Sequence, residues 1–252
     1  EIEVTEWTLS NGLRVIALQD DTTSTVTTSM WYDIGSKLDP QGRSGFAHLF
    51  EHIMFNGSEN APGDFFEPLR QIGATDLNGT TWLDRTNYFQ TVPKSALDVA
   101  LFLESDRMGY LLNAVTQEKL DNQIGVVSNE KRQGDNRPYG LVGYRQTELL
   151  FPEPHPYGHT TIGSLKDLEA ASLDDMKKWF IDHYGPNNSI LVLAGDIDAD
   201  TLKHVLDDIF GSLPTVDIPE APVLELQHKG EVAVYDQLDI PQTVIEIMQP
   251  GI

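Results

Sequence analysis

Residues 46–57 read Phe46-Ala-His-Leu-Phe-Glu-His-Ile-Met-Phe-Asn-Gly57, and this stretch decides most of what the chain can do. Its apolar residues recur at helical spacing, and an Asn-Gly pair is a typical helix end, so the sequence predicts a helix over 44–55. On that helix His48 and His52 are one turn apart and face the same way, with Glu51 beside them. The apolar residues supply the buried face, which leaves the three polar side chains to form a site.

Two imidazoles on adjacent turns can bind one metal ion, and Zn²⁺ suits them. The chain has no cysteine, so a metal must be held by histidine and carboxylate. A catalytic zinc also needs a third protein ligand and an open position. We select Glu130, which lies late in a helix predicted over 116–132 that can pack against the first helix. Glu51 is then the general base. The competing interpretation is a chance pattern, with Glu130 an ordinary solvated helix residue.

The rest of the chain mixes predicted strands with separate runs of helices, which is typical of an α+β fold. Alternating residues predict strands over 4–9, 13–18, 25–34 and 190–194, and two short strands within 74–89 around Leu83-Asp84. Helical spacing predicts further helices over 64–71, 94–112, 138–150, 172–183 and 200–210.

The composition changes near residue 213, which suggests a domain boundary. Residues 1–213 are predicted to form the metal-binding domain, and the Pro-, Asp- and Glu-containing segment 214–230 an extended linker. Residues 231–252 contain two predicted strands, 232–235 and 243–248, which cannot form a domain alone. We therefore expect the chain to stop early in a second module, as a truncated form or one piece of a larger enzyme.

The net charge of −22 argues against nucleic-acid binding, since a phosphate backbone attracts lysine and arginine. A solvated acidic surface is favoured over a role in steering basic ligands. The longest apolar runs are far too short for a membrane span, and no signal peptide is recognisable at Glu1. The compartment stays open, with the periplasm favoured over the cytoplasm.

Several motifs, in order and spacing, resemble those of the inverzincin zinc peptidases: pitrilysin, insulin-degrading enzyme and the mitochondrial processing peptidase β subunit. The pattern is nearest to the bacterial half-size members. The residues that carry the resemblance span nearly the whole chain: His48-Leu-Phe-Glu-His52 with Ile-Met-Phe-Asn-Gly-Ser after it, Leu77-Asn-Gly-Thr-Thr-Trp-Leu-Asp-Arg-Thr-Asn-Tyr88, Leu120-Asp-Asn-Gln-Ile-Gly-Val-Val-Ser-Asn-Glu130-Lys-Arg-Gln, His155-Pro-Tyr-Gly-His-Thr-Thr-Ile-Gly163 and Tyr184-Gly-Pro-Asn-Asn-Ser-Ile-Leu-Val-Leu-Ala-Gly-Asp196.

The resemblance implies one half of a clamshell, with a mixed, mostly antiparallel sheet and helices packed on it. It implies that His48, His52 and Glu130 bind Zn²⁺ and that Glu51 is the catalytic base. These assignments agree with those drawn from the residues themselves.

The resemblance also implies roles for residues outside the histidine motif. Asn78 and Gly79 match an edge strand on which an extended peptide substrate adds as a further strand, although an ordinary turn is an equal interpretation of the pair. Gln123 stands where many members have a glutamate that orients a ligand. A neutral amide there is expected to lower the metal affinity without abolishing binding.

The function indicated is that of a zinc metalloendopeptidase that hydrolyses peptides or unfolded polypeptides, this chain being the catalytic N-terminal half. Its partner is a C-terminal homologous half or a partner subunit, a second copy of the chain included. The alternatives are a non-catalytic metal-binding or recognition subunit and a structural metal domain. A second metal site at His155 and His159 is not expected, because prolines interrupt any helix there. His183 and His204 are expected on helix surfaces.

Overall fold

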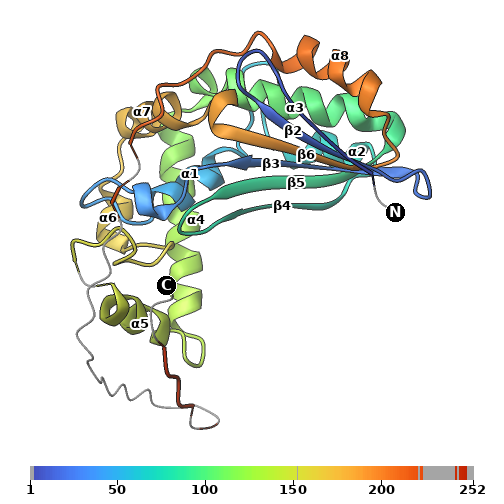
Figure 1. Ribbon diagram of the computed structural model, residues 1–252. Helices are drawn as coiled ribbons and strands as arrows, with labels where there is room; N and C mark the ends of the chain where they lie inside the picture. Colours follow the sequence, from blue (N-terminus) through green and yellow to red (C-terminus); the bar gives the residue numbers. More distant parts are fainter. Residues whose placement is uncertain (1–2, 152, 221, 224–241, 243, 249–252) are drawn as a thin grey trace.

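A computed structural model describes residues 3–151, 153–220, 222–223, 242 and 244–248 of the chain. Among them, a single sheet has the strand order β1-β2-β6-β3-β5-β4 (Figure 1). The strands are β1 (Glu3–Thr8), β2 (Arg14–Gln19), β3 (Thr25–Tyr32), β4 (Thr75–Thr81), β5 (Thr86–Pro93) and β6 (Ser189–Gly195). Strands β2 and β6 are parallel, and the other adjacent pairs are antiparallel. The predicted α+β fold with a mixed, mostly antiparallel sheet is confirmed.

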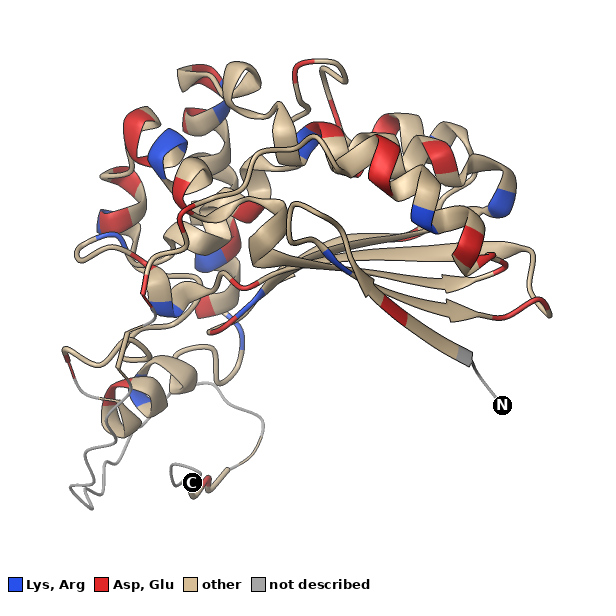
Figure 2. Cartoon of the chain, turned by 45° about the horizontal axis from the view of Figure 1, so that its top comes forward, with Lys and Arg blue, Asp and Glu red and all other residues tan. Residues whose placement is uncertain are grey.

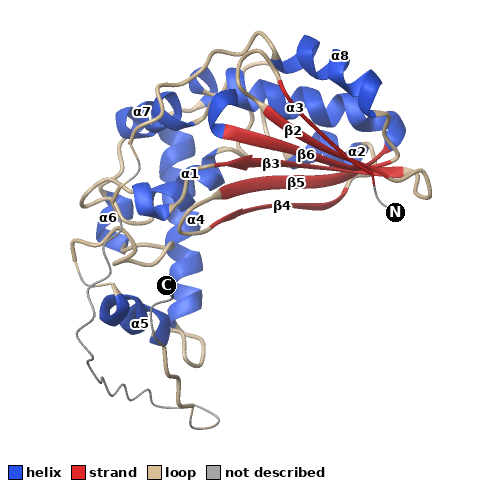
Figure 3. Ribbon diagram, viewed as in Figure 1, coloured by secondary structure: helices blue, strands red, loops and turns tan. Residues whose placement is uncertain are grey.

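The α-helices largely follow the predicted ranges, with shifted ends (Figure 3). Their bounds are α1 (Phe46–Ile53), α2 (Phe66–Gln71), α3 (Leu97–Gly109), α4 (Gln117–Asp135), α5 (Val142–Leu150), α6 (Leu165–Glu169), α7 (Leu173–His183) and α8 (Ala199–Phe210). The short α6 was not predicted. Its first turn is held by Ser164, whose hydroxyl accepts a hydrogen bond from the Asp167 N–H at 3.1 Å.

Helices α3 and α8 cover one face of the sheet (Figure 1). The strands show why that face is buried. On β3, alternate residues Val26, Met30 and Tyr32 are almost completely excluded from solvent, while Thr27 and Ser29 between them are only half-buried. Full burial of such apolar side chains stabilises the fold by about 1.5–3 kcal/mol each. The sheet is therefore a rigid platform, and its end near α1 positions the site.

The two helices that carry the site pack against each other at one end of the sheet. Helix α1 contacts α4, α6 and β4. Helix α4 begins at Thr116, whose hydroxyl accepts a hydrogen bond from the Lys119 N–H at 3.3 Å. Its buried residues Leu120 and Val127 face the core that α1 also joins. Because α1 spans only two turns, it depends on this packing for its stability.

Three sequence-based expectations need correction or lie beyond what is described. Residues 244–248 form no strand, since an extended segment without a paired neighbour makes no ladder. The strand predicted at 232–235 lies outside the described residues. The described part of the segment 214–230 has no helix or strand, and its role as a linker stays a prediction. His183 is buried, not on the surface, because α7 packs the face formed by Met176, Trp179 and His183 into the core.

The charged residues and the lengths of the helices bear on the surroundings in which the fold can exist. Acidic residues gather on the helices, while the strands carry few charges (Figure 2). Within the described ranges, none of the helices combines the length and apolar character needed to cross a bilayer.

Candidate active site

Helix α1 is anchored at its first turn by a buried carboxylate. Asp39 accepts hydrogen bonds from the backbone N–H groups of Gly45 and Ala47, both at 2.8 Å. A carboxylate at a helix N-terminus satisfies donors that have no partner within the helix. Burial raises the pKa of Asp39 to about 8, although these hydrogen bonds oppose the shift. Asp39 therefore fixes where the helix starts and, with it, the direction of the side chains further along.

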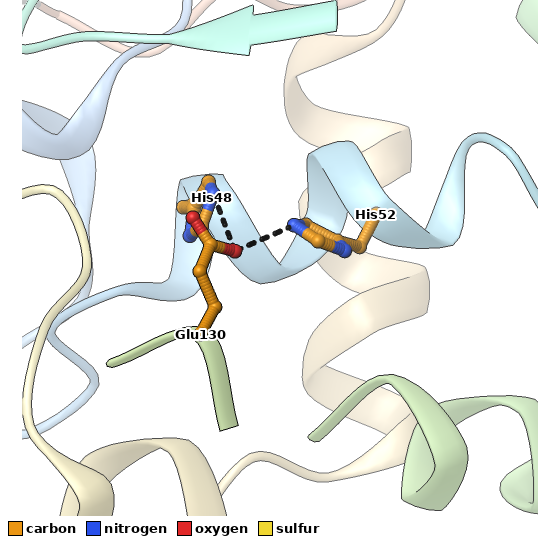
Figure 4. A group of neighbouring side chains, drawn as sticks. All are labelled: His48, His52 and Glu130. Atoms are coloured by element: carbon orange, nitrogen blue, oxygen red, sulfur yellow. Dashed lines mark ion pairs between the residues drawn. The ribbon is translucent and has the colours of Figure 1, made fainter. Parts of the chain in front are cut away.

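The structure brings His48, His52 and Glu130 together (Figure 4). Glu130 Oε2 lies 3.8 Å from His48 Nε2 and 3.5 Å from His52 Nε2. One possible ligand atom from each residue lies within 4.8 Å of the others. The two imidazole rings are 4.8 Å apart and nearly perpendicular, so their nitrogens converge on the same point. The predicted meeting of two distant parts of the chain is thus observed.

The three side chains fit a zinc ion in their chemistry. Two imidazoles and one carboxylate are the ligand set of several catalytic zinc sites, and this set leaves a fourth position open. Burial and the neighbouring His52 lower the pKa of His48 to about 4, which keeps its nitrogen available to a metal. Burial also disfavours the charged form of His52, but the hydrogen bond with Glu130 and the nearby carboxylates outweigh this and raise its pKa. His52 must therefore release a proton before it binds a cation.

Glu51 lies next to this group and, although deeply buried, lines the cavity in front of it. It is only 6% exposed, and its Oε2 accepts a hydrogen bond from the Thr81 hydroxyl at 2.5 Å. Burial raises the pKa of Glu51, although the Thr81 hydroxyl and the charge of His52 oppose the shift. A carboxylate in such surroundings accepts a proton more readily than one in water.

Gln123 on α4 contacts the C-terminal end of α1. Its amide nitrogen donates to Asn56 Oδ1 at 3.2 Å, and the Asn56 amide donates to the His52 carbonyl at 2.8 Å. Gln123 also hydrogen-bonds the His52 side chain and contributes to its raised pKa. The amide thus ties α4 to α1 without adding a charge.

A cavity of about 1330 Å³ opens in front of these residues. Strand β4, an edge strand, forms one wall through Asn78, Gly79 and the residues after them. The Gly79 N–H donates to Asn78 Oδ1 at 2.9 Å. A Cβ at Gly79 would lie 2.8 Å from the Phe55 ring, so glycine allows this ring to pack against the strand. Asn78 and Gly79 therefore belong to a strand, and the alternative of an ordinary turn is wrong.

Among the described residues, the other histidines are not part of the group of three. The His155 ring packs against Phe151 in a tilted arrangement, with ring centroids 4.8 Å apart, and its Nδ1 accepts a hydrogen bond from the Tyr157 N–H. His159 lines the cavity, 3.8 Å from Asp39. His204 is exposed, as expected.

Sequence reasoning missed two residues that hold the site, Asp39 and Thr81. Asp39 lies too far ahead of α1 to be recognised as a local cap. The contact of Thr81 with Glu51 depends on how α1 packs against β4, which no local pattern encodes.

Comparisons with known proteins show the family to which the fold belongs. Residues 14–138 match the family described as insulinase (peptidase family M16), and residues 170–252 match the peptidase M16 inactive domain. The zinc protease PqqE of Helicobacter pylori is 30% identical over 217 residues, which are 85% of this chain and 48% of that protein. The mitochondrial-processing peptidase subunit beta of Saccharomyces cerevisiae is 24% identical in an alignment that covers 97% of this chain and 53% of that subunit.

Solved structures show the same fold. A protease from Helicobacter pylori superposes with a TM-score of 0.82 at 28% identity, over 90% of this chain and 54% of that chain. Pitrilysin superposes with a TM-score of 0.79 at 22% identity, over 90% of this chain and 25% of its own.

The fold is that of the α+β units found in pitrilysin and in the Helicobacter pylori protease. The chain belongs to the insulinase family of peptidases, family M16. It spans about half the length of the curated relatives it matches.

Proposed function

We propose that this chain is the catalytic half of a zinc metalloendopeptidase that cleaves peptides or unfolded polypeptides. The observation that carries the proposal is the convergence of His48, His52 and Glu130 beside a buried Glu51 that makes no part of the group. His48, His52 and Glu130 would hold the zinc ion. When bound, zinc supplies Lewis-acid chemistry, polarising a carbonyl and making water more acidic. Relatives named zinc proteases support this choice of metal.

Glu51 is proposed to accept the proton of a water molecule on its carboxylate and to pass it to the leaving amine. Two features support this role. The side chain is adjacent in sequence to His52, and burial raises the pKa of its carboxyl group, which suits proton transfer near neutral pH. Gln123 would hold His52 in place through a neutral hydrogen bond, which predicts weaker metal binding than a glutamate would give.

The edge strand β4 is proposed to receive the substrate. Asn78 and Gly79 lie on its cavity side, and the strand pairs with β5 on one edge only. An extended peptide can add to such an edge through main-chain hydrogen bonds. To do so at Gly79, the peptide would take over the N–H that Asn78 now accepts from.

A second half is proposed to close the cavity from the other side. The cavity is open, and the relatives are about twice as long as the match. Residues 231–252 would then begin that half after the linker 214–230. A partner subunit or a second copy of the chain could supply it instead. The periplasm stays our preferred compartment as a prediction from sequence.

The test is to measure bound zinc and hydrolysis of internally quenched fluorogenic peptides together, with this chain alone and in the full-length protein. We expect zinc in both and efficient hydrolysis only in the second. Zinc binding without any hydrolysis by the full-length protein would contradict the proposal and favour the recognition-subunit alternative. Efficient cleavage by the chain alone would refute the need for a second half.

A further inference from the structure

One contact in the site has no role in the function proposed so far. The Thr81 hydroxyl, on the last residue of β4, lies 2.5 Å from Glu51 Oε2. Both side chains are buried, at 9% and 6% exposure. A carboxylate at this depth has few ways to satisfy its oxygens, so a hydroxyl aimed at one of them restricts its orientation.

The direction of this hydrogen bond follows from the groups behind it. Thr86 Oγ1 lies 3.3 Å from Thr81 Oγ1 and donates its own proton to the Ile34 carbonyl at 2.8 Å. An ionised carboxylate can only accept, so Thr81 must be the donor toward Glu51. Thr86 has no second hydroxyl proton to donate, so Thr81 and Thr86 are in contact at 3.3 Å without a hydrogen bond between them. The donor is therefore held between the sheet and the helix.

The sheet makes this arrangement rigid. Thr81 pairs with Thr86 in the β4–β5 ladder, and Thr86 pairs with Tyr32 on the central strand β3. Two and three residues earlier on β4, Gly79 and Asn78 face Tyr88 and Phe89 of β5 in the same register. One strand thus carries both the proposed docking positions for substrate and the donor to the proposed base.

We propose that Thr81 is a positioning residue, which fixes the Glu51 carboxylate relative to the edge strand so that base and docked peptide share one register. This inference rests on the proposed function, because it assigns Thr81 a role in the reaction of the same site. A purely structural role, in which the hydroxyl only satisfies a buried carboxylate, is the alternative. The two roles make different predictions for removal of the hydroxyl. A positioning role predicts that kcat falls while KM stays the same, whereas a purely structural role predicts no such selective loss.

The test uses three variants of the full-length protein. Thr81→Val removes the hydroxyl and keeps a β-branched side chain suited to a strand. Thr81→Ser keeps the hydroxyl. Thr27→Val is the matched control, since it removes a hydroxyl that makes a 2.8 Å hydrogen bond to Thr91 elsewhere in the sheet. For each variant, zinc content, kcat and KM are measured, together with the ¹³C resonance of the Glu51 carboxyl group, assigned by its loss in Glu51→Gln.

For Thr81→Val we expect kcat to fall by about 10–100-fold, the range typical of residues that orient an active-site group. We expect KM and zinc content to stay as in the wild type, and the carboxyl resonance to shift. Thr81→Ser should restore most of kcat and the original resonance, and Thr27→Val should change neither.

An unmoved carboxyl resonance in Thr81→Val would overturn the proposal, and so would an unchanged kcat. A loss of kcat equal to that of Thr27→Val, or no recovery in Thr81→Ser, would assign the hydroxyl a structural role. A wild-type protein that holds zinc and cleaves no peptide refutes the proposed function itself. An active wild type, together with a Thr81→Val variant whose kcat and Glu51 carboxyl resonance are unchanged, refutes only the positioning role of Thr81.

Discussion

In the part of the chain that the structure describes, two buried glutamates lie on helices, and the groups that contact their carboxylates differ. Glu104 on α3 is completely buried, and Arg107 donates to its two oxygens at 3.0 and 2.6 Å. Gln90 adds a third hydrogen bond at 2.9 Å. Glu51 on α1 is almost as deeply buried, yet the group that donates a hydrogen bond to its carboxylate is the neutral hydroxyl of Thr81.

The difference indicates that Glu104 stabilises the fold, whereas Glu51 is positioned to take part in the reaction. A buried carboxylate that is paired at close range with a guanidinium stabilises the core through that pair, and loss of the partner leaves an uncompensated charge. Glu51 instead lines the cavity beside the proposed metal ligands. The comparison makes separate predictions for the two glutamates, since one should affect turnover and the other stability.

The largest expected effect is on turnover. Glu51→Gln removes the proton acceptor and keeps the shape of the side chain, so we expect the rate of peptide hydrolysis to fall on the order of 10³-fold or more. Zinc content and melting temperature should stay close to those of the wild type. The measurement is kcat at saturating substrate, with zinc quantified in the same sample. Retained turnover with bound metal would remove Glu51 from the mechanism.

The next effect is on stability. Arg107→Met leaves the Glu104 carboxylate buried without its counter-charge, which typically costs about 3–5 kcal/mol. It also removes a guanidinium that lies 3.9 Å from the centre of the Phe65 ring. Urea unfolding of the full-length protein measures the change in free energy.

The control for this prediction is Arg14→Met. Arg14 pairs with Glu6 at 2.6 Å, but both side chains are about half exposed, at 51% and 53%. An exposed pair contributes only about 0–1 kcal/mol. If Arg107→Met were no more destabilising than Arg14→Met, the claim that the Arg107–Glu104 pair stabilises the fold would be wrong.

A smaller effect concerns the pH dependence of zinc binding. The pKa of His52 is raised above its ordinary value of 6.5, so this residue holds a proton that zinc must displace. The affinity should therefore rise with pH, by about tenfold per unit, until the pH passes the raised pKa of His52, and then level off. His48, with a pKa of about 4, adds a second dependence only in acid. Competition with a zinc chelator between neutral and mildly acidic pH measures the slope, and a flat profile would contradict this assignment.

Part of the site could be predicted from sequence because it is local. His48, Glu51 and His52 share two turns of one helix, and helical spacing alone sets their common direction. Glu130 required more, namely the packing of α4 against α1, for which the resemblance to a known family was the stronger argument. Thr81 could not be found, because its contact depends on the register of β4 against β5 and on the docking of α1 at the end of that strand.

His183 was expected on a helix surface but is buried, and the spacing of the apolar residues on α7 explains why. Met176, Trp179, Phe180 and His183 follow helical spacing, so the pattern places the histidine on the apolar stripe of α7. Its ring packs 4.3 Å from the Trp179 ring, and its Nδ1 lies 3.0 Å from the Trp179 carbonyl. Histidine is a polar residue type, which suggested a surface position. The packing of the apolar face of α7 into the core nevertheless buries it.

The most direct measurement of the central claim is the zinc content of the wild type beside three glutamate variants. Glu130→Gln removes a proposed ligand, Glu51→Gln a neighbour that binds no metal, and Glu118→Gln an exposed residue in the first turn of the same helix α4. If His48, His52 and Glu130 hold the zinc, we expect about one zinc per chain in the wild type, in Glu51→Gln and in Glu118→Gln, and little in Glu130→Gln. Full zinc content in Glu130→Gln, or loss of zinc in Glu51→Gln, would contradict it.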